Sequence, residues 1–275
     1  MGSTSSEPFS ERGRIAHLAY RSTGSPVDLV FLHGFSDSAE CWGPFIKALD
    51  DVSNKRWKSL AFDARGHGES GLPDDSLSHF ANVADAVTVL EAIDAAARGG
   101  VVVIGHSMGA VVTSTVAAER PDLVRAIVLE DPPPEVYASY EGSPFQVPDW
   151  LREARSGDLV ACMAACRERE PAWPEDEIEP WAVSKRQLNM ALFEAPYRPP
   201  HALLEMLGEM SCPVLLLHGD TERGSLISDA FAEECAAAAG GKLQAVHIEG
   251  AGHNVRRDGR AAFLSSVYDF LLRYA

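Results

Sequence analysis

Basic residues are scarce relative to acidic ones in this chain. Lysine and arginine together number 24, aspartate and glutamate together number 40, and the formal net charge is −16 at pH 7. Phosphate backbones and anionic lipid headgroups repel a chain of this sign. The composition therefore disfavours a nucleic acid or a membrane as a partner, and it indicates a solvated acidic surface.

The cysteines lack the spacing that a disulfide framework or a zinc site requires. There are five of them, an odd number, and no two form a Cys-x-x-Cys pair. We therefore predict reduced core side chains at Cys41, Cys162, Cys166, Cys212 and Cys235. We also predict no metal site, and we expect the reducing cytoplasm as the compartment.

Long apolar runs are absent as well. No run reaches the length needed to span a bilayer, and the first residues, MGSTSSEPFSERGR, contain no apolar stretch of the kind found in signal peptides. We therefore expect a chain that neither crosses a membrane nor carries a secretory signal.

What the sequence does contain is a regular alternation of short apolar runs and amphipathic segments. Its 275 residues, 46% of them hydrophobic, suffice for one large α/β domain with an insertion. Apolar runs typical of strands buried on both faces occupy residues 27–32, 59–62, 101–104, 126–129, 214–217 and 243–248.

Helices are predicted between these strands. One follows the N-cap Ser78, one runs from Met108 to about Arg120 because Pro121 follows, and the last covers about 260–274. The alternation predicts an α/β fold with a doubly wound, mostly parallel sheet of about eight strands.

The alternation stops between Pro132 and Pro213. This segment contains no convincing strand, but it has helical stretches at 158–170, 181–194 and 201–210. We predict that it forms a helical insertion over the carboxyl edge of the sheet.

A serine between two glycines follows the apolar run at 101–104. Gly105-His106-Ser107-Met108-Gly109 has the spacing of a nucleophile elbow, with a predicted strand before it and a predicted helix after it. Small neighbours let the two arms of a sharp turn approach each other, and the turn presents the hydroxyl at the positive end of the helix. Ser107 is therefore the candidate nucleophile.

A serine hydroxyl needs a base that accepts its proton. Among nine histidines, His253 fits best, because it follows the last predicted strand and the small residues Gly250-Ala251-Gly252 that would let a loop carry the imidazole over the sheet. His247 lies within that strand and His106 lies inside the elbow, so we assign neither to catalysis.

The acid that orients the imidazole is expected between the nucleophile and the base in the chain. Asp131 follows the apolar run at 126–129, and Glu222 follows the run at 214–217. Both would emerge at the carboxyl edge of the sheet, where open α/β sheets build their sites. Both residues are therefore candidates.

An oxyanion hole needs two backbone N–H groups. Met108 would supply one, as the residue after the nucleophile. The other is expected from the loop after the first apolar run, where His33-Gly34-Phe35 offers the Phe35 N–H.

Together these motifs resemble the α/β-hydrolase superfamily. The resemblance covers most of the chain and rests on HGF at 33–35, DARGHGES at 63–70, GHSMG at 105–109, HGD at 218–220 and GAGH at 250–253. It implies a hydrolase core at residues 1–133 and 211–275 and a helical cap at 134–210. It also implies that the segment 63–70 is mainly a structural turn, so that His67 is not catalytic.

The resemblance also bears on the acid and on the substrate. Many members carry the acid where Glu222 stands, although the loop here lacks the usual proline, whereas others carry it where Asp131 stands, and we favour Asp131. The cap usually shapes the substrate pocket. Trp150, Trp173 and Trp181 are therefore candidate substrate contacts, with the cap's own core as the alternative.

The motifs and the resemblance predict a serine hydrolase of the carboxylic ester class. Such an enzyme cleaves an ester, lactone or related acyl bond of a small, apolar molecule through an acyl-enzyme, without a metal or an organic cofactor. Carbon–carbon bond hydrolysis, thioester cleavage and perhydrolysis use the same triad and stay open. A metabolite cyclase, a ligand receptor and an interaction module are further alternatives, and we expect a monomer or a homodimer.

Overall fold

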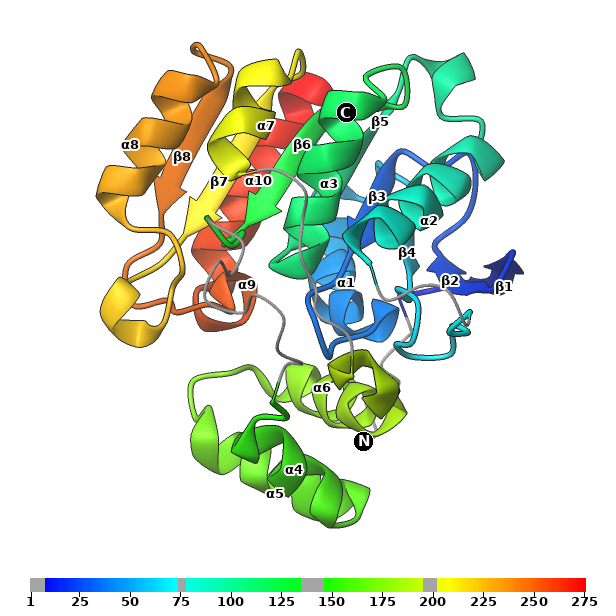
Figure 1. Ribbon diagram of the computed structural model, residues 1–275, viewed down its shortest axis with the longest axis vertical. Helices are drawn as coiled ribbons and strands as arrows, with labels where there is room; N and C mark the ends of the chain where they lie inside the picture. Colours follow the sequence, from blue (N-terminus) through cyan, green and yellow to red (C-terminus); the bar gives the residue numbers. More distant parts are fainter. Residues whose placement is uncertain (1–7, 74–77, 135–145, 195–201) are drawn as a thin grey trace.

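One sheet of eight strands forms the centre of the molecule (Figure 1). The computed structural model describes residues 8–73, 78–134, 146–194 and 202–275, and its strand order is β1-β2-β4-β3-β5-β6-β7-β8. The strands are β1 (Glu11–Ile15), β2 (Leu18–Ser22), β3 (Leu29–Leu32), β4 (Ser59–Phe62), β5 (Val101–His106), β6 (Val124–Glu130), β7 (Val214–His218) and β8 (Leu243–His247). All neighbours from β4 to β8 are parallel, whereas β2 pairs antiparallel with both β1 and β4.

All six predicted strands are present, and β1 and β2 are two further strands that the sequence did not predict. β1 is an edge strand of the sequence ERGRI with mostly exposed side chains. It therefore contains no apolar run of the kind that marks a buried strand.

Among the described residues, seven helices and three 3-10 turns accompany the sheet in the core. The helices are α1 (Gly43–Ser53), α2 (His79–Ala92), α3 (Met108–Glu119), α7 (Leu203–Glu209), α8 (Asp229–Ala238), α9 (Val255–Asp258) and α10 (Arg260–Tyr274), and the turns are η1 (Ala39–Trp42), η2 (Ala96–Arg98) and η5 (Thr221–Arg223). The predicted cap of α2 is confirmed, because the Ser78 hydroxyl accepts a hydrogen bond from Ala81 N.

Both faces of the sheet are covered, which explains why its central strands are continuously apolar. In β3, Val30 and Leu32 join the apolar cluster beneath α2, α3, α7 and α8. Leu29 and Phe31 point to the opposite face and join the cluster beneath α1 and α10. The doubly wound architecture predicted from the sequence is therefore confirmed.

Three helices form a separate layer below the sheet in Figure 1, which we term the cap. They are α4 (Asp149–Ser156), α5 (Leu159–Arg169) and α6 (Glu175–Gln187), followed by the 3-10 turn η4 (Met190–Phe193). The cap lies between β6 and α7 in the chain. Helix α6 of the cap packs on η1 of the core.

The predicted carboxyl end of the cap at residue 210 is wrong. Helix α7 packs on α3 and α8, and its Leu203, Met206 and Leu207 belong to the same apolar cluster as the sheet. Apolar side chains facing the sheet layer make α7 part of the core. His201, where we predicted this helix to begin, lies outside the described residues, as do 135–145 and 195–200 of the predicted cap.

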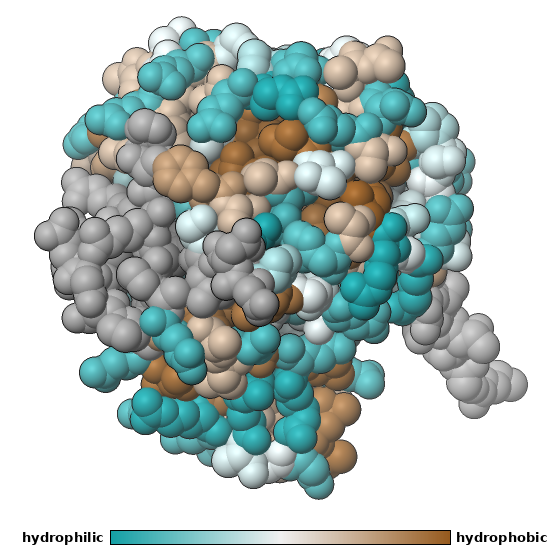
Figure 2. All heavy atoms as spheres, turned by 45° about the vertical axis from the view of Figure 1, so that its right-hand side comes forward, coloured by the Kyte–Doolittle hydropathy of each residue, from teal (hydrophilic) through white to brown (hydrophobic). Residues whose placement is uncertain are grey.

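Figure 2 shows hydrophilic side chains over most of one face, with hydrophobic side chains gathered in smaller areas between them. This agrees with the acidic composition. Within the described residues, no helix is long and apolar enough to cross a bilayer. All five cysteines are free and buried, as predicted.

Candidate active site

The turn between β5 and α3 holds Ser107 in a strained backbone conformation. Its φ of +50° and ψ of −116° lie in a region that residues with side chains seldom occupy. Two glycines permit the turn, because a Cβ on Gly105 would lie 2.5 Å from Gly109 O and a Cβ on Gly109 would collide with Leu32 O. The strand–turn–helix context predicted for Ser107 is present.

Ser107, His253 and Asp131 form one continuous chain of hydrogen bonds, which we term the candidate triad. His253 Nδ1 lies 2.6 Å from Asp131 Oδ2, and His253 Nε2 lies 3.0 Å from Ser107 Oγ. Because an ionised carboxylate only accepts, Nδ1 carries the proton and Nε2 is left to accept from the serine hydroxyl. This tautomer is the one that a general base requires.

Asp131 is fully buried and is held from three sides. Its Oδ1 accepts hydrogen bonds from Ser225 Oγ at 2.7 Å and from Ile227 N at 3.2 Å, and Leu226 N donates to both carboxylate oxygens. Hydrogen bonds of this kind fix the plane of the carboxylate. The side chain of the base, His253, is 31% exposed, so the imidazole faces the outside while it rests on a buried carboxylate.

Glu222, the other candidate acid, does not reach the imidazole. It lies in η5 with its side chain exposed, and the position on His253 Nδ1 is occupied by Asp131. The neighbouring Asp220 instead bonds to His247 Nε2 at 2.7 Å and to Gly250 N at 2.8 Å. The structure therefore corrects the inclusion of Glu222 among the site residues.

The loop after β3 lies against the elbow, as the oxyanion prediction requires. A Cβ on Gly34 would lie 2.6 Å from His106 Nδ1 and 3.2 Å from the Cβ of Ser107. His33 Nε2 accepts from Ala64 N at 3.0 Å, so its Nδ1 carries the proton and donates to Gly34 O at 2.8 Å. In a trans peptide the C=O and N–H point in opposite directions, so this bond fixes the direction of the Phe35 N–H.

A second buried histidine holds the same loop. His67 Nε2 accepts a hydrogen bond from Ser36 N at 3.1 Å, and the His67 ring packs edge-on against Phe35 with centroids 5.4 Å apart. Burial lowers the pKa of His33 to about 4 and the pKa of His67 to about 3, so both rings are neutral acceptors at pH 7. The expectation that His67 is structural agrees with these contacts.

The three cap tryptophans pack with one another and not around the candidate triad. The ring centroids of Trp150 and Trp173 each lie 6.3 Å from that of Trp181, and the guanidinium of Arg169 lies over both Trp150 and Trp181. Trp173 Nε1 donates to Asp258 of α9 at 2.7 Å. The assignment of Trp173 and Trp181 to substrate binding is therefore corrected, because their rings are buried in the cap's own apolar cluster, whereas Trp150 is 37% exposed and touches that cluster only through Trp181 and Arg169 within the described residues.

Six buried charged side chains near the candidate triad were missed by sequence analysis. We term them the buried charge cluster, and its members are Asp37, Glu130, Glu177, Lys185, Arg256 and Arg257, none more than 4% exposed. One signal was available, because Glu130 is a charged residue directly after the apolar run at 126–129. The other five lie in three separate segments of the chain, at Asp37, in α6 and in α9, and these segments come together only in the fold.

The electrostatics of the cluster depend on Asp37. Burial alone would raise the pKa of Asp37, but Arg257, Lys185 and Arg256 outweigh it and hold that pKa well below its usual range. Asp37 is therefore ionised. Burial raises the pKa of Glu130, a rise that Arg256 opposes.

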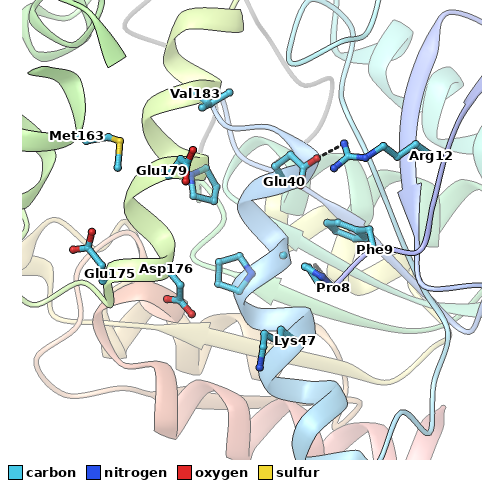
Figure 3. A pocket seen from close by; sticks show the side chains of 13 residues that line it. Pro8, Phe9, Arg12, Glu40, Lys47, Met163, Glu175, Asp176, Glu179 and Val183 are labelled. Atoms are coloured by element: carbon cyan, nitrogen blue, oxygen red, sulfur yellow. Dashed lines mark hydrogen bonds and ion pairs between the residues drawn. The ribbon is translucent and has the colours of Figure 1, made fainter. Parts of the chain in front are cut away.

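A cavity of about 730 Å³ lies at the seam between the cap and the core, apart from the candidate triad (Figure 3). Glu175, Asp176 and Glu179 of α6 face it from one side, and Lys47 and Arg12 of the core face it from the other. None of the triad residues lines it. Within the described residues, no group of three or more histidine, cysteine, aspartate or glutamate side chains is placed to hold a metal ion.

Comparisons with known proteins agree with the fold. A model of the family described as "Alpha/beta hydrolase family" matches residues 29–265. The chain is 34% identical over 119 residues to 2-(acetamidomethylene)succinate hydrolase of Mesorhizobium japonicum, covering 43% of this chain and 40% of that protein. It is 34% identical over 118 residues to (E)-2-((N-methylformamido)methylene)succinate hydrolase of Acinetobacter baylyi, covering 42% and 41%. The matched segment therefore spans about two fifths of the length of these curated relatives.

Solved structures match over nearly the whole chain. The structure of E-2-(acetamidomethylene)succinate hydrolase superposes with a TM-score of 0.70 at 25% identity, covering 95% of this chain and 98% of that one. The N-formylmaleamic acid deformylase of Pseudomonas putida S16 superposes with a TM-score of 0.73 at 21% identity, covering 94% and 99%, which shows a shared fold.

Proposed function

The chain belongs to the alpha/beta hydrolase family, and we propose that it is a serine hydrolase whose triad is Ser107, His253 and Asp131. The observation that carries this proposal is the unbroken hydrogen-bond chain from the buried carboxylate through the imidazole to the serine hydroxyl. The geometry already has the distances and the tautomer that proton transfer requires.

The reaction follows from these contacts. Ser107 Oγ forms a bond to the carbonyl carbon of the substrate while its proton moves to His253 Nε2, and Asp131 stabilises the resulting imidazolium. The N–H groups of Phe35 and Met108 hold the oxyanion. The imidazolium then protonates the leaving group, and a water molecule, deprotonated by His253, releases the acid and restores Ser107.

We propose a small acyl compound as the substrate, with an ester or lactone as the first class to test. The triad and the oxyanion hole complete the reaction without a metal or an organic cofactor. The position of the cap beside the site, between β6 and α7, supports a substrate small enough to be enclosed.

A second candidate substrate class is favoured by the two curated relatives. Both are named as hydrolases of methylenesuccinate compounds that carry an acetamido or formamido group. A small dicarboxylate with such a group is therefore the next compound to offer the enzyme.

The first experiment combines a covalent labelling assay with a turnover assay. We expect a fluorophosphonate probe to label the protein, and a series of p-nitrophenyl esters of increasing chain length to be hydrolysed. Ser107→Ala removes the nucleophile, so we expect no labelling and a loss of kcat of about 10⁶-fold.

The matched control is Ser114→Ala on α3. It removes a buried hydroxyl that donates to the backbone oxygen of Ala110 in the same helix. It is expected to keep both labelling and turnover. Labelling of Ser107→Ala as strong as that of the wild type would refute the proposed nucleophile. Tight ligand binding by an unlabelled wild type would instead identify a receptor.

A further inference from the structure

The buried charge cluster lies next to each segment that carries a proposed reacting group. Asp37 is two residues after Phe35, Glu130 precedes Asp131, and Arg256 is three residues after His253. The sequence positions alone do not require these three charges to meet. In the fold, Arg256 Nη2 lies 3.2 Å from Asp37 Oδ2, and Arg256 Nη1 lies 2.9 Å from Glu130 Oε2.

Glu130 joins three of the segments by itself. Its carbonyl accepts a hydrogen bond from Ser107 N at 3.0 Å, and its Oε1 accepts one from the backbone N of Arg256 at 2.8 Å. Asp131 is the next residue in the chain. A displacement of the Glu130 side chain would therefore be transmitted to the elbow, the acid and the histidine loop.

The cap enters the cluster through α6. Lys185 Nζ donates to Ser36 O at 2.9 Å and to Asp37 Oδ1 at 2.6 Å. Ser36 follows Phe35 and has a φ of +68°, a conformation that a residue with a side chain keeps only when its surroundings hold it. A side chain of the cap thus supports the loop that would bind the oxyanion.

A second contact ties α6 to the helix after the histidine loop. Glu177 accepts from Arg257 Nε at 3.2 Å, and Arg257 Nη2 lies 2.8 Å from Asp37 Oδ2. The six side chains, three of them acidic and three basic, therefore form one continuous network from the cap to the segments that carry the triad.

Packing of the cap against the core does not by itself require a network of buried charges. Buried ion pairs contribute little net stability, and apolar side chains of similar volume often replace them without loss. Charged groups with fixed hydrogen bonds do hold backbone segments at defined positions, which an apolar contact does not. The placement of every core member within four residues of a reacting group therefore indicates positioning.

We propose that Lys185 and Glu130 are positioning residues, and that the seating of cap helix α6 sets the geometry of the oxyanion loop and the triad through the buried charge cluster. This inference rests on the proposed serine hydrolase function. The cap would then act on the chemical step itself as well as enclosing the substrate.

The test removes the charge at the cap end of the network. Lys185→Met keeps the length of the side chain and loses its three donors. Displacement of reacting groups by about 1 Å costs up to about 10²-fold in rate, so we expect kcat for the preferred ester to fall at least tenfold with KM unchanged. Affinity for an aryl boronic acid, which forms a tetrahedral adduct with the serine, should fall in parallel with kcat.

The matched control is Lys47→Met on α1, where the lysine is 43% exposed and pairs with Asp51. It is expected to leave kcat, KM and boronic acid affinity unchanged. Glu130→Gln tests the network from the core end, because it keeps the shape and the acceptor for Arg256 N while losing the charge. It should reproduce the fall in kcat, and it provides the test if Lys185→Met does not fold.

A spectroscopic readout makes the test independent of turnover. The proton on His253 Nδ1 bonds to Asp131 at 2.6 Å and should give a strongly downfield proton NMR signal. We expect this signal to shift or broaden in Lys185→Met at a temperature where circular dichroism shows the native fold.

The outcomes separate this inference from the proposed function. A kcat within twofold of the wild type, with an unchanged His253 signal, would overturn the positioning role and leave the hydrolase proposal intact. If the wild type is neither labelled nor active, the hydrolase proposal fails. In that case the His253 signal alone tests the positioning role. A shifted or broadened signal in Lys185→Met supports this role, and an unchanged signal overturns it.

Discussion

Asp131 leaves β6 with a φ of +42°, in the left-handed region of the backbone. Aspartate tolerates this conformation better than most residues. The sharp turn directs the carboxylate back toward the carboxyl edge of the sheet, where Ser225, Leu226 and Ile227 donate to it. The identity of the acid thus depends on a backbone turn and on donors nearly 100 residues away in the chain.

Asparagine at this position tests the assignment of the acid. Ser225, Leu226 and Ile227 all donate to Oδ1, so the amide oxygen of the asparagine would occupy that position. Its NH₂ group would then face His253 Nδ1. The imidazole would then carry its proton on Nε2, the wrong tautomer for accepting from Ser107. We expect Asp131→Asn to lower kcat by about 10⁴-fold with the fold retained.

The control for this substitution is Glu222→Gln, at the exposed position in η5. Its kcat should equal that of the wild type, measured by steady-state kinetics on the same ester. A collapse of kcat in Glu222→Gln together with an active Asp131→Asn would assign the acid to the other loop.

Ser107 and His253 could be predicted from the sequence because each depends on local order. The elbow needs only small residues between a strand and a helix, and the base needs only a short loop after the last strand. The acid could not be decided, because Asp131 and Glu222 both follow strands that end at the same edge. The cap tryptophans could not be placed, because a ring that packs within the cap and a ring that lines a pocket have the same sequence pattern.

At the scale of elements, periodicity predicted the buried parallel strands and the long helices well. The last helix was expected over about 260–274 and was found as α10 at Arg260–Tyr274. Edge strand β1 was missed because exposed strands carry no apolar run. The end of the cap was misplaced because α7 is a short helix, and only its partners α3 and α8 show to which layer it belongs.

The assignment of α7 to the core can be tested by a cavity mutation. Leu207 is fully buried in the cluster beneath the sheet. We expect Leu207→Ala to lower the free energy of unfolding by about 2–5 kcal/mol, measured by urea denaturation in a single transition. Leu272→Ala, at a position on α10 that is 43% exposed, should change it by less than about 0.5 kcal/mol.

The result would contradict the assignment if Leu207→Ala produced a separate early transition with the sheet intact. In that case α7 would unfold with the cap, as the sequence boundary at residue 210 implied.

At the scale of the whole molecule, buried neutral histidines make stability depend on pH. His67 is lowered in pKa to about 3 by burial, whereas an unfolded histidine has a pKa near 6.5. As the pH falls, His67 therefore binds a proton in the unfolded chain at a higher pH than in the folded protein. The stability contributed by neutral His67 is fully present above about pH 6.5 and is lost as the pH falls toward 3.

The contribution of His67 can be measured as the difference in the free energy of unfolding between the wild type and a variant that lacks this histidine. His67→Gln keeps an acceptor for Ser36 N and removes the titrating group, and every other ionisable group is common to both proteins. We expect the free energy of unfolding of the wild type to fall more steeply between about pH 5.5 and pH 4, by about 1.4 kcal/mol per pH unit. Urea denaturation at several pH values measures both curves, and parallel curves would show that His67 is protonated in the fold.

The buried charge cluster also constrains how the chain can change over generations. Loss of one member leaves an uncompensated buried charge at a cost of about 3–5 kcal/mol, a large part of the about 5–15 kcal/mol that keeps a domain folded. Joint replacement of the whole set by apolar residues carries no such cost. Descendants of this chain should therefore keep the six residues together or lose them together, while α4 and α5, which contribute none of them, remain free to diverge.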